Sequence, residues 1–492
     1  MATASRTRKK KATGRKNGAG KRGGAPLAAI VLAAGKGTRM RSSRAKVLHE
    51  LLGQSLVSYP VELARSMGAD PVVAVLGHQH EAVEAVLLAR FGTGAVKVVE
   101  QTEQRGTGHA VRLAMPALAR FDGNSGMVMV LYGDVPLLRR ETLEELVGTA
   151  RRYGCLAIVT ATPPDPTGYG RILRDQRGHV IGVVEQKDAT PEEQAITEIN
   201  AGIYCGPAGF FREAVLGLGT RNAQGEYYLT DVIARAAGSI GVSAIEADFV
   251  DVAGINDRHQ LAEAEMTLRG RINRAWQAHV TYRDPGSTVV EPGVDIGVDV
   301  ELGCNVALRG RTRIGHGARI GDGVILTDTE VGAGAVIRPY TVATEAVIGV
   351  GCAVGPFAHL RPGTRLHADV HVGNFVETKK TEIGRGSKAN HLSYLGDAII
   401  GEKVNVGAGT ITCNYNGYEK FPTIIEDDAF IGSDTQLVAP VRIGRRAVVA
   451  AGTTVTRDVP AAALALSRTP QIDKPGYAQK VAKRYSNKKG SH

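Results

Sequence analysis

The C-terminal half of the chain carries an aliphatic side chain at every sixth position over long stretches. Neither an α-helix, with about 3.6 residues per turn, nor a strand, with a period of about two, produces that spacing. A coil with flat faces of about six residues does, and such hexapeptide repeats are the signature of a parallel β-helix. We therefore predict a solenoid in which three hexads close one triangular turn, aliphatic side chains stack inside, and Gly or Asn lies at corners that need a positive φ. The repeated positions are Ile296, Leu302, Leu308, Ile314, Ile320 and Leu326, then Ile348, Val354, Leu360, Leu366 and Val372, and later Ile425, Ile431, Leu437, Ile443, Val449 and Val455.

The rest of the composition bounds the class of protein. A length of 492 residues predicts at least two domains, and 61 glycines suit a solenoid with many corners. No apolar run approaches the ~20 residues of a membrane-spanning helix, and the N-terminus lacks the apolar core of a signal peptide, so we expect a cytoplasmic protein. The five cysteines lack CxxC spacing and are expected to be reduced thiols.

The net charge of +11 is concentrated in two tails. Residues 1–24 carry nine Lys/Arg and no acid, and residues 471–492 carry six Lys/Arg and one Asp, which leaves the body near −3. The Lys, Gly, Ser and Asn content of both tails predicts disorder. A basic tail can contact phosphates, but without interleaved aromatic residues we expect no more than non-specific contact with nucleic acid.

A glycine loop follows a strand near the N-terminus. Residues 28–34 form a continuous apolar run, typical of a parallel strand buried on both faces. They lead into Gly35-Lys36-Gly37-Thr38-Arg39-Met40 and a helical stretch, an arrangement that lets backbone N–H groups approach a phosphate. The spacing fits neither a Walker A loop nor GxGxxG. The string LAAGKGTRM followed by Lys46 instead resembles the signature of sugar-nucleotide pyrophosphorylases, although Ala45 replaces the proline usual before the lysine.

This resemblance implies a Rossmann-like α/β domain with a mostly parallel sheet that binds UTP and a sugar 1-phosphate. Arg39 and Lys46 match the cations on the triphosphate and the sugar phosphate. Asp134 matches the metal aspartate, and Asn256 is its expected fellow ligand for Mg²⁺, here followed by Asp257 where a second Asn is common. The positions that match nucleotide- and sugar-binding residues are Leu32, Ala33, Gly35, Lys46, Gln101, Gly106, Thr107, Tyr132, Gly170, Glu185, Asn200 and Asn256. Of these, Gln101, Gly106 and Thr107 lie in the string QTEQRGTGHA, which matches the base-recognition loop of the family.

The implied reaction needs no protein nucleophile. The sugar phosphate oxygen attacks the α-phosphorus of the nucleoside triphosphate, and pyrophosphate leaves. Because a phosphate is already an adequate nucleophile, catalysis reduces to positioning and to charge neutralisation by Mg²⁺, Arg39 and Lys46.

Helical spacing marks the join between the two halves. The pattern predicts one helix of about 24 residues, from Asp257 to about Val280, acting as a spacer. The apolar residues that carry this spacing are Leu261, Leu268, Ile272, Ala275 and Trp276.

Three segments interrupt the hexads with polar residues that a solenoid does not need for stability. They are Arg361-Pro362-Gly363, Glu377-Thr378-Lys379-Lys380 and residues 387–394. Cations suit a sugar phosphate, and a histidine that titrates near neutral pH suits proton removal from an attacking amine. This half resembles the acetyltransferase domain of the bifunctional N-acetylglucosamine-1-phosphate uridyltransferase/glucosamine-1-phosphate acetyltransferase family, which implies a left-handed β-helix.

The same resemblance assigns the residues of a second site. His391 matches the general base, and the amine of glucosamine attacks the acetyl-CoA thioester directly, so Cys413 is expected to pack rather than react. Thr378 replaces a larger apolar residue of the family pattern. The matches to glucosamine 1-phosphate contacts are Arg361, Lys379, Tyr394, Asn405 and Lys420, and those to acetyl-CoA contacts are Ala408, Asn414, Tyr415, Ser433, Ala451 and Arg468.

The resemblance covers about residues 26–470. It divides the chain into a basic tail (1–25), a pyrophosphorylase domain (26–256), a linker helix (257–284), a β-helix acetyltransferase domain (285–470) and a second basic tail (471–492). It implies a cytoplasmic bacterial homotrimer that makes UDP-N-acetylglucosamine for cell-envelope polymers, with acetylation before uridylylation.

Two alternatives remain at this stage. In the first, the chain is a single-activity sugar-nucleotide pyrophosphorylase and the β-helix only a trimerisation scaffold; the intact HLSYLGD and NYNG segments argue against it. In the second, the basic tails make the chain chiefly a nucleic-acid- or surface-binding protein; the neutral-to-acidic body argues against that.

Overall fold

The computed structural model describes residues 25–121 and 126–486. The chain divides into two compact units, Met1–Ala264 and Glu265–His492, and each is described by itself. Within the described ranges, no helix combines the length and the apolar character that crossing a bilayer would take.

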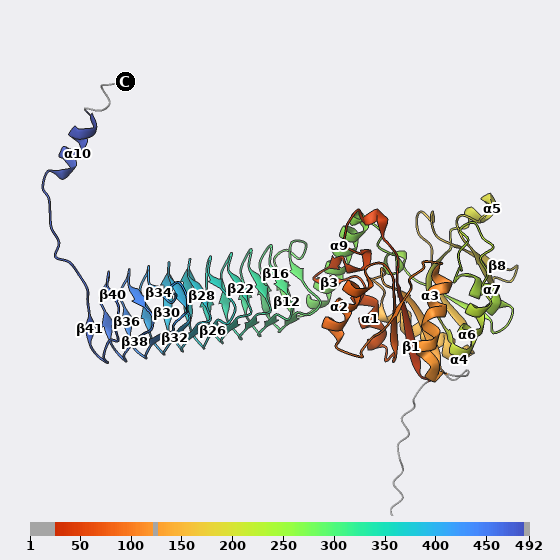
Figure 1. Ribbon diagram of the computed structural model, residues 1–492, viewed down its shortest axis with the longest axis horizontal. Helices are drawn as coiled ribbons and strands as arrows, with labels where there is room; N and C mark the ends of the chain where they lie inside the picture. Colours follow the sequence, from red (N-terminus) through yellow and green to blue (C-terminus); the bar gives the residue numbers. More distant parts are fainter. Residues whose placement is uncertain (1–24, 122–125, 487–492) are drawn as a thin grey trace, which may run out of the picture. The chain divides into compact units, whose positions relative to one another are not determined.

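A nine-stranded sheet forms the centre of the N-terminal unit (Figure 1). Its strands are β1 (Leu27–Ala33), β4 (Val72–Leu76), β5 (Lys97–Glu100), β6 (Met127–Tyr132), β7 (Leu156–Ala161), β8 (Arg171–Arg174), β9 (Val180–Val184), β10 (Ile199–Pro207) and β11 (Val242–Glu246). The main path runs β11-β7-β10-β6-β1-β4-β5. β1 pairs in parallel with β4 and β6, whereas β10 runs antiparallel to β6 and β7. The mostly parallel α/β sheet predicted for this half is confirmed.

Helices cover both faces of this sheet. They are α1 (Ser58–Ser66), α2 (His80–Phe91) and α4 (Arg140–Tyr153) on one face, and α3 (Thr107–Ala114), η3 (Met115–Phe121), α6 (Ala208–Leu216) and α7 (Asp231–Ala237) on the other. Alternate residues of β1 enter the two apolar clusters, because successive side chains of a strand point to opposite faces. The shorter elements are η1 (Thr38–Met40), η2 (Lys46–Leu48), β2 (Glu50–Leu51), β3 (Gln54–Ser55), α5 (Pro191–Gln194) and α8 (Phe249–Val252).

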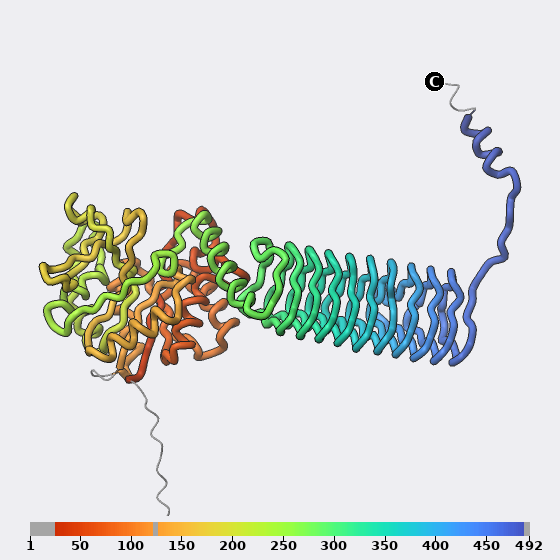
Figure 2. The backbone as a smooth tube through the Cα atoms, turned by 180° about the vertical axis from the view of Figure 1, so that it is seen from behind, coloured from red at the N-terminus to blue at the C-terminus, as the bar shows by residue number. Residues whose placement is uncertain are grey.

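The C-terminal unit is a parallel β-helix with three sheets, here called sheets I, II and III, whose coils stack in sequence order (Figure 2). Each coil visits the sheets in that order, so a strand pairs in parallel with the third strand after it; Val290 of one coil, for example, lies beside Leu308 of the next. The last coil is the exception, because its Leu464 strand is only the second strand after the one that contains Val448. Every aliphatic position of the predicted ladder is buried and belongs to one continuous core. The predicted solenoid and its interior are confirmed.

The strands of the three sheets have the following bounds. Sheet I consists of β12 (Val280–Tyr282), β15 (Val300–Leu302), β18 (Arg319–Ile320), β21 (Val336–Ile337), β24 (Ala353–Val354), β27 (His371–Asn374), β30 (Lys388–His391), β33 (Asn405–Val406), β36 (Phe430–Ile431), β39 (Val448–Val449) and β41 (Leu464–Ala465). Sheet II consists of β13 (Val289–Val290), β16 (Ala307–Arg309), β19 (Ile325–Thr327), β22 (Val342–Thr344), β25 (His359–Leu360), β28 (Glu377–Lys379), β31 (Tyr394–Gly396), β34 (Ile411–Cys413), β37 (Gln436–Val438) and β40 (Thr454–Val455). Sheet III consists of β14 (Asp295–Ile296), β17 (Arg313–Ile314), β20 (Glu330–Val331), β23 (Val347–Ile348), β26 (Arg365–Leu366), β29 (Glu382–Ile383), β32 (Ala398–Ile400), β35 (Thr423–Ile425) and β38 (Val441–Ile443).

The segment that connects the two halves differs from its prediction. Helix α9 (Arg258–Trp276) has 19 residues instead of about 24 and contains all five apolar positions that predicted it. Val280, expected to end the helix, instead begins β12, pairs with Val300 and lies in the β-helix core. The predicted linker helix 257–284 is therefore too long. The β-helix starts five residues before 285, because Val280 already belongs to its first coil.

The predicted C-terminal disorder is also wrong for part of the tail. Residues Tyr477–Ser486 form helix α10, whose described residues are all exposed or half-buried. The segment between Tyr477 and Tyr485 is rich in Ala, Gln, Lys and Arg, which favour helix, whereas the composition of the whole tail hid this local preference. The disorder predicted for residues 1–24 and 487–492 lies outside the described residues.

Candidate active sites

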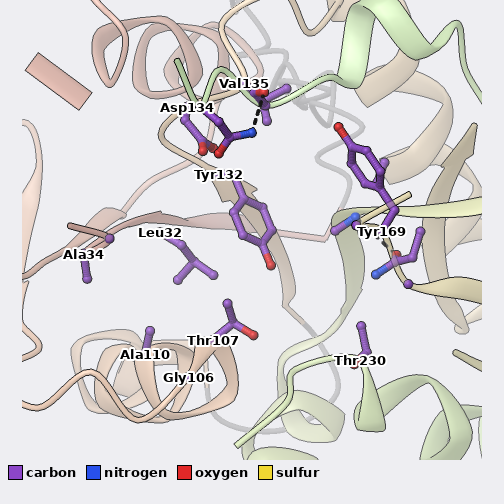
Figure 3. Close-up of a pocket in the computed structure, with 18 of the residues that line it drawn as sticks. Leu32, Ala34, Gly106, Thr107, Ala110, Tyr132, Asp134, Val135, Tyr169 and Thr230 are labelled. Carbon is purple, nitrogen blue, oxygen red and sulfur yellow. Dashed lines mark hydrogen bonds between the residues drawn. The ribbon is translucent and has the colours of Figure 1, made fainter. Parts of the chain in front are cut away.

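The N-terminal unit contains a cavity of about 630 Å³ at the carboxyl ends of β1 and β6. In an open parallel sheet, ligands bind at this end of the strands. Figure 3 shows Leu32, Tyr132 and Tyr169 around this cavity. All fourteen residues expected at the nucleotide and metal site line it: Leu32, Ala33, Gly35, Arg39, Lys46, Gln101, Gly106, Thr107, Tyr132, Asp134, Gly170, Glu185, Asn200 and Asn256.

The glycine loop after β1 has two kinds of glycine. Gly37 has a φ of 61°, and a Cβ on it would collide with the Lys46 Cβ, so only glycine lets the loop close over that lysine. A Cβ on Gly35 would meet no other atom within 4 Å, so the space above it is open toward the cavity. The loop therefore holds Lys46 at the cavity while leaving room for a ligand above Gly35.

The two expected metal ligands face a single cation. The Lys46 ammonium contacts Asp134 Oδ2 and lies 3.3 Å from Asn256 Oδ1. Asn256 Nδ2 donates to the Gly254 carbonyl (3.1 Å), which leaves its oxygen turned toward the lysine. One carboxylate and one amide oxygen around one positive charge fit Mg²⁺, which usually binds through one or two protein oxygens and completes its shell with phosphate oxygens and water. Among the described residues, no group of three His, Cys, Asp or Glu suggests another metal site.

The end of the cavity where the sugar is expected is built from buried and half-buried polar groups. Glu185 Oε1 accepts a hydrogen bond from Thr230 Oγ1 (2.9 Å), and burial raises the pKa of the Glu185 carboxyl. Asn200 donates from Nδ2 to the Tyr204 hydroxyl (2.7 Å). Burial also raises the pKa of Tyr132, which stays a neutral phenol. These fixed donors and acceptors suit the hydroxyls of a sugar.

Several residues of this cavity escaped the sequence analysis. Gln104 donates from Nε2 to the Ala34 carbonyl (2.7 Å), which ties the QTEQRGTGHA segment to the glycine loop. Its place inside that motif was a signal that could have found it. Thr230 and Tyr228 also line the cavity, but they are far from every motif in sequence, so no pattern pointed to them.

The β-helix gathers its predicted residues along one corner and one face. The corner between sheets I and II carries Asn374 and His391 on adjacent coils, and the Asp434 and Gly452 amides continue this column by donating to the carbonyls of Ala408 (2.7 Å) and Ser433 (2.8 Å). Arg468 donates from Nη2 to the Ala451 carbonyl (3.0 Å). The expected general base and four expected acetyl-CoA contacts thus share one corner: His391, Ala408, Ser433, Ala451 and Arg468.

His391 is oriented by its neighbour on the previous coil. Its Nδ1 lies 2.9 Å from the Asn374 Oδ1, and the two residues are in register between β27 and β30. An amide oxygen only accepts hydrogen bonds, so Nδ1 carries the proton and Nε2 is left with a free lone pair. The His391 side chain is exposed, so this nitrogen is accessible to a substrate. Asn374 was not predicted, because nothing in its local sequence marks it.

Cations gather beside this corner on sheet II. The close approach of the Lys420 ammonium, together with its charge and that of Arg361, lowers the pKa of Lys379. Arg361 pairs with Glu377 (2.7 Å). Three clustered cations, with the Glu377 carboxylate paired to Arg361 and the Asp397 carboxylate nearby, favour a dianionic phosphate.

The remaining predicted residues lie around this cluster. Tyr394 begins β31 on sheet II, and Asn405 begins β33, the next strand of sheet I. Asn414 is buried and donates from Nδ2 to Asp397 Oδ2 (2.5 Å). Tyr415 and Lys420 form an antiparallel bridge that closes the long loop leaving the coils in residues 413–422.

Comparison with known proteins agrees with both halves. Residues 29–197 match the MobA-like NTP transferase domain, and residues 422–457 match the hexapeptide repeat of succinyl-transferase. The fold and the two sites therefore define a nucleotidyltransferase joined to a hexapeptide-repeat acyltransferase with a left-handed β-helix.

Whole-length relatives give the family. The chain is 54% identical to the "Bifunctional protein GlmU" of Sorangium cellulosum, over 93% of this chain and 97% of the relative. It is 50% identical to the protein of the same name from Pelobacter propionicus, over 93% and 99%, and 51% identical to that of an Anaeromyxobacter strain, over 94% of each. The chain belongs to the bifunctional GlmU family and is a bifunctional transferase, so the scaffold-only and tail-binding alternatives are wrong.

Proposed function

We propose that the chain makes UDP-N-acetylglucosamine at two independent sites. The β-helix site acetylates glucosamine 1-phosphate with acetyl-CoA, and the N-terminal site then transfers a uridylyl group from UTP to the N-acetylglucosamine 1-phosphate. The observation that carries this proposal is the gathering of all fourteen predicted nucleotide and metal residues around one cavity. UTP and acetyl-CoA are cytoplasmic metabolites, which supports action in the cytoplasm.

At the nucleotide site, the chain positions two phosphates and neutralises their charge. Lys46 and Arg39 line the cavity next to Asp134 and Asn256, the pair that would hold Mg²⁺. When bound, the metal supplies Lewis-acid stabilisation of phosphate charge. The sugar phosphate oxygen attacks the α-phosphorus, the bond to the bridging oxygen breaks, and pyrophosphate leaves with the electron pair. No protein group needs to accept a proton.

At the β-helix site, Asn374 presents the lone pair of His391 Nε2. The glucosamine amine attacks the thioester carbonyl, its proton passes to Nε2, and the coenzyme A thiolate leaves as the tetrahedral intermediate collapses. Arg361, Lys379 and Lys420 hold the sugar phosphate and so fix the distance between amine and base. Burial raises the pKa of the Cys413 thiol, which disfavours a thiolate nucleophile and supports direct transfer.

A coupled assay tests the two activities and their order. The enzyme is given glucosamine 1-phosphate, acetyl-CoA, UTP and Mg²⁺, and free thiol and pyrophosphate are followed separately. We expect both to appear, with pyrophosphate lagging behind thiol and disappearing when acetyl-CoA is omitted. Chelation of the metal should stop pyrophosphate release and leave thiol release intact. Pyrophosphate release without any thiol would contradict the acetyltransferase assignment.

We also propose that the working form is a homotrimer associated through the β-helix. An exposed column of large apolar side chains follows the corner between sheets I and II: Tyr340, Phe357, Phe375 and Leu392. All four adopt positive φ, which costs a bulky residue roughly 1–2 kcal/mol each. The three aromatic rings stack with centroids 5.2 and 5.4 Å apart. These residues are strained, stacked and exposed, and they repeat on successive coils, so they suit a contact with the same column on another copy of the chain. Leu392 places this contact next to His391.

The oligomer prediction can be checked by measuring mass. The Phe357→Lys substitution should lower the mass in solution from that of a trimer, because a charge would be buried in the contact. Acetyl transfer should fall with it, whereas uridylyl transfer should persist. Tyr153→Lys, at an exposed tyrosine of α4, is the matched control and should leave the trimer intact. A trimer of unchanged stability in the Phe357 variant would rule out this column as the contact.

A further inference from the structure

The base-recognition residue Gln101 is held by a histidine that has no role assigned so far. Gln101 follows β5, lines the nucleotide cavity and is only 4% exposed. Its Nε2 lies 3.1 Å from the Gly106 carbonyl oxygen and 3.1 Å from the Nδ1 of His109 on α3. Both N–H groups of the amide are therefore directed at protein atoms.

The Gly106 carbonyl decides which way the amide is turned. A carbonyl oxygen only accepts hydrogen bonds, so the NH₂ end of Gln101 must face it. The same NH₂ group then meets His109, so Nδ1 has to be the unprotonated, accepting nitrogen of the ring. A Cβ on residue 106 would lie 2.7 Å from the Tyr227 carbonyl oxygen, so the loop that supplies the deciding oxygen packs closely against Tyr227.

The surroundings of His109 keep it neutral. Burial lowers the pKa of His109, and the charges of Arg112 and Arg105 lower it further, against a smaller opposing effect of Glu103. The ring stacks on Tyr227 with centroids 6.2 Å apart, and the Arg112 guanidinium lies over the same tyrosine (5.3 Å). A neutral ring in a packed position provides the acceptor that the Gln101 amide needs.

The consequence is that Gln101 offers an oxygen to the ligand. Uracil has a donor at N3 between two carbonyl groups, which an amide oxygen can accept. Cytosine has an unprotonated acceptor at N3, so the same amide oxygen would repel it. The opposite orientation of the Gln101 amide would not allow cytosine to bind better, because the amide oxygen would then face the Gly106 carbonyl oxygen.

We propose that His109 is a positioning residue that sets the preference of the nucleotide site for a uracil base over cytosine, by fixing the orientation of the Gln101 amide. The inference rests on the proposed uridylyl transfer and deepens it. His109 does not line the cavity, so it would act through Gln101.

The test compares a substitution that removes the accepting nitrogen of His109 with one that keeps an acceptor there. His109→Phe keeps a ring but removes the acceptor, and His109→Asn restores an acceptor at the position of Nδ1. Steady-state pyrophosphate release with N-acetylglucosamine 1-phosphate is measured for UTP and for CTP, giving kcat and KM for each. We expect His109→Phe to lower the ratio of kcat/KM for UTP over CTP about tenfold or more, mainly through KM for UTP. His109→Asn should retain most of the wild-type ratio.

Controls separate this inference from the proposed function. His80→Phe, at a half-exposed histidine of α2 outside the cavity, should leave the ratio unchanged. The melting temperature reports whether each variant is folded, and thiol release at the β-helix site reports whether the other unit is unaffected. Wild-type enzyme that releases no pyrophosphate from UTP would contradict the proposed function. If the wild type is active and the UTP/CTP ratio is the same in the wild type, His109→Phe and His109→Asn, only the role of His109 is overturned. If the Phe variant does not fold, a fall of the ratio in His109→Asn would also overturn that role.

Discussion

Replacing Asp134 by Asn is expected to lower uridylyl transfer by about 10²–10³-fold, because Asp134 is the charged member of the proposed metal-binding pair and its loss would remove several kcal/mol of transition-state stabilisation. The same change removes the charged partner of the Lys46 ammonium. Pyrophosphate release from UTP and N-acetylglucosamine 1-phosphate measures the loss. Thiol release from acetyl-CoA should remain at the wild-type rate, since Asp134 and His391 belong to different compact units.

Two further measurements make this result specific. Glu145→Gln removes an exposed carboxylate of α4 outside the cavity and should leave both activities unchanged. Titration with Mn²⁺ in the presence of UTP should show weakened metal binding in the Asp134 variant. Near wild-type pyrophosphate release in Asp134→Asn would remove the metal assignment.

The His391→Ala substitution is expected to lower acetyl transfer by about 10²–10⁴-fold, the usual contribution of a positioned general base. Since the side chain is exposed, its loss should not change the melting temperature. Uridylyl transfer from supplied N-acetylglucosamine 1-phosphate should continue unchanged. Thiol release from acetyl-CoA is the direct measurement.

A second histidine on the same sheet provides the matched control. His371 begins β27, is exposed and is not part of the predicted site, so His371→Ala should retain acetyl transfer. Asn374→Ala should lie between the two, because the base remains while its tautomer is no longer fixed. If His391→Ala retained acetyl transfer, the proton would have to leave the amine by another route.

The β-helix was predictable because its interior repeats in sequence. The hexads give its aliphatic core directly, and the segments that looked like interruptions still stack: Thr378 and Ala389 occupy interior positions as fully as Leu360 does. Small interior residues concealed those coils, because large aliphatic side chains carry the visible pattern. The residues that line the N-terminal cavity were largely predictable because most lie in short contiguous motifs.

What escaped prediction depends on contacts between distant segments. Thr230 meets Glu185, and Asn374 meets His391, through packing that no local pattern records. His109 lies inside a recognised motif, yet its role depends on an accepting nitrogen that only the fold turns toward Gln101. The end of α9 was missed because Val280 fits both a helical spacing and the first coil.

The contact of Lys46 with both Asp134 and Asn256 has a consequence for the enzyme between turnovers. The site carries its own counter-ion, so a divalent ion arriving by itself must displace the lysine against charge repulsion and the loss of an ion pair. A triphosphate offers the lysine a new anionic partner at the moment the carboxylate becomes available. We therefore expect the enzyme without nucleotide to have low affinity for free metal ions, and to bind the cation and the nucleotide together.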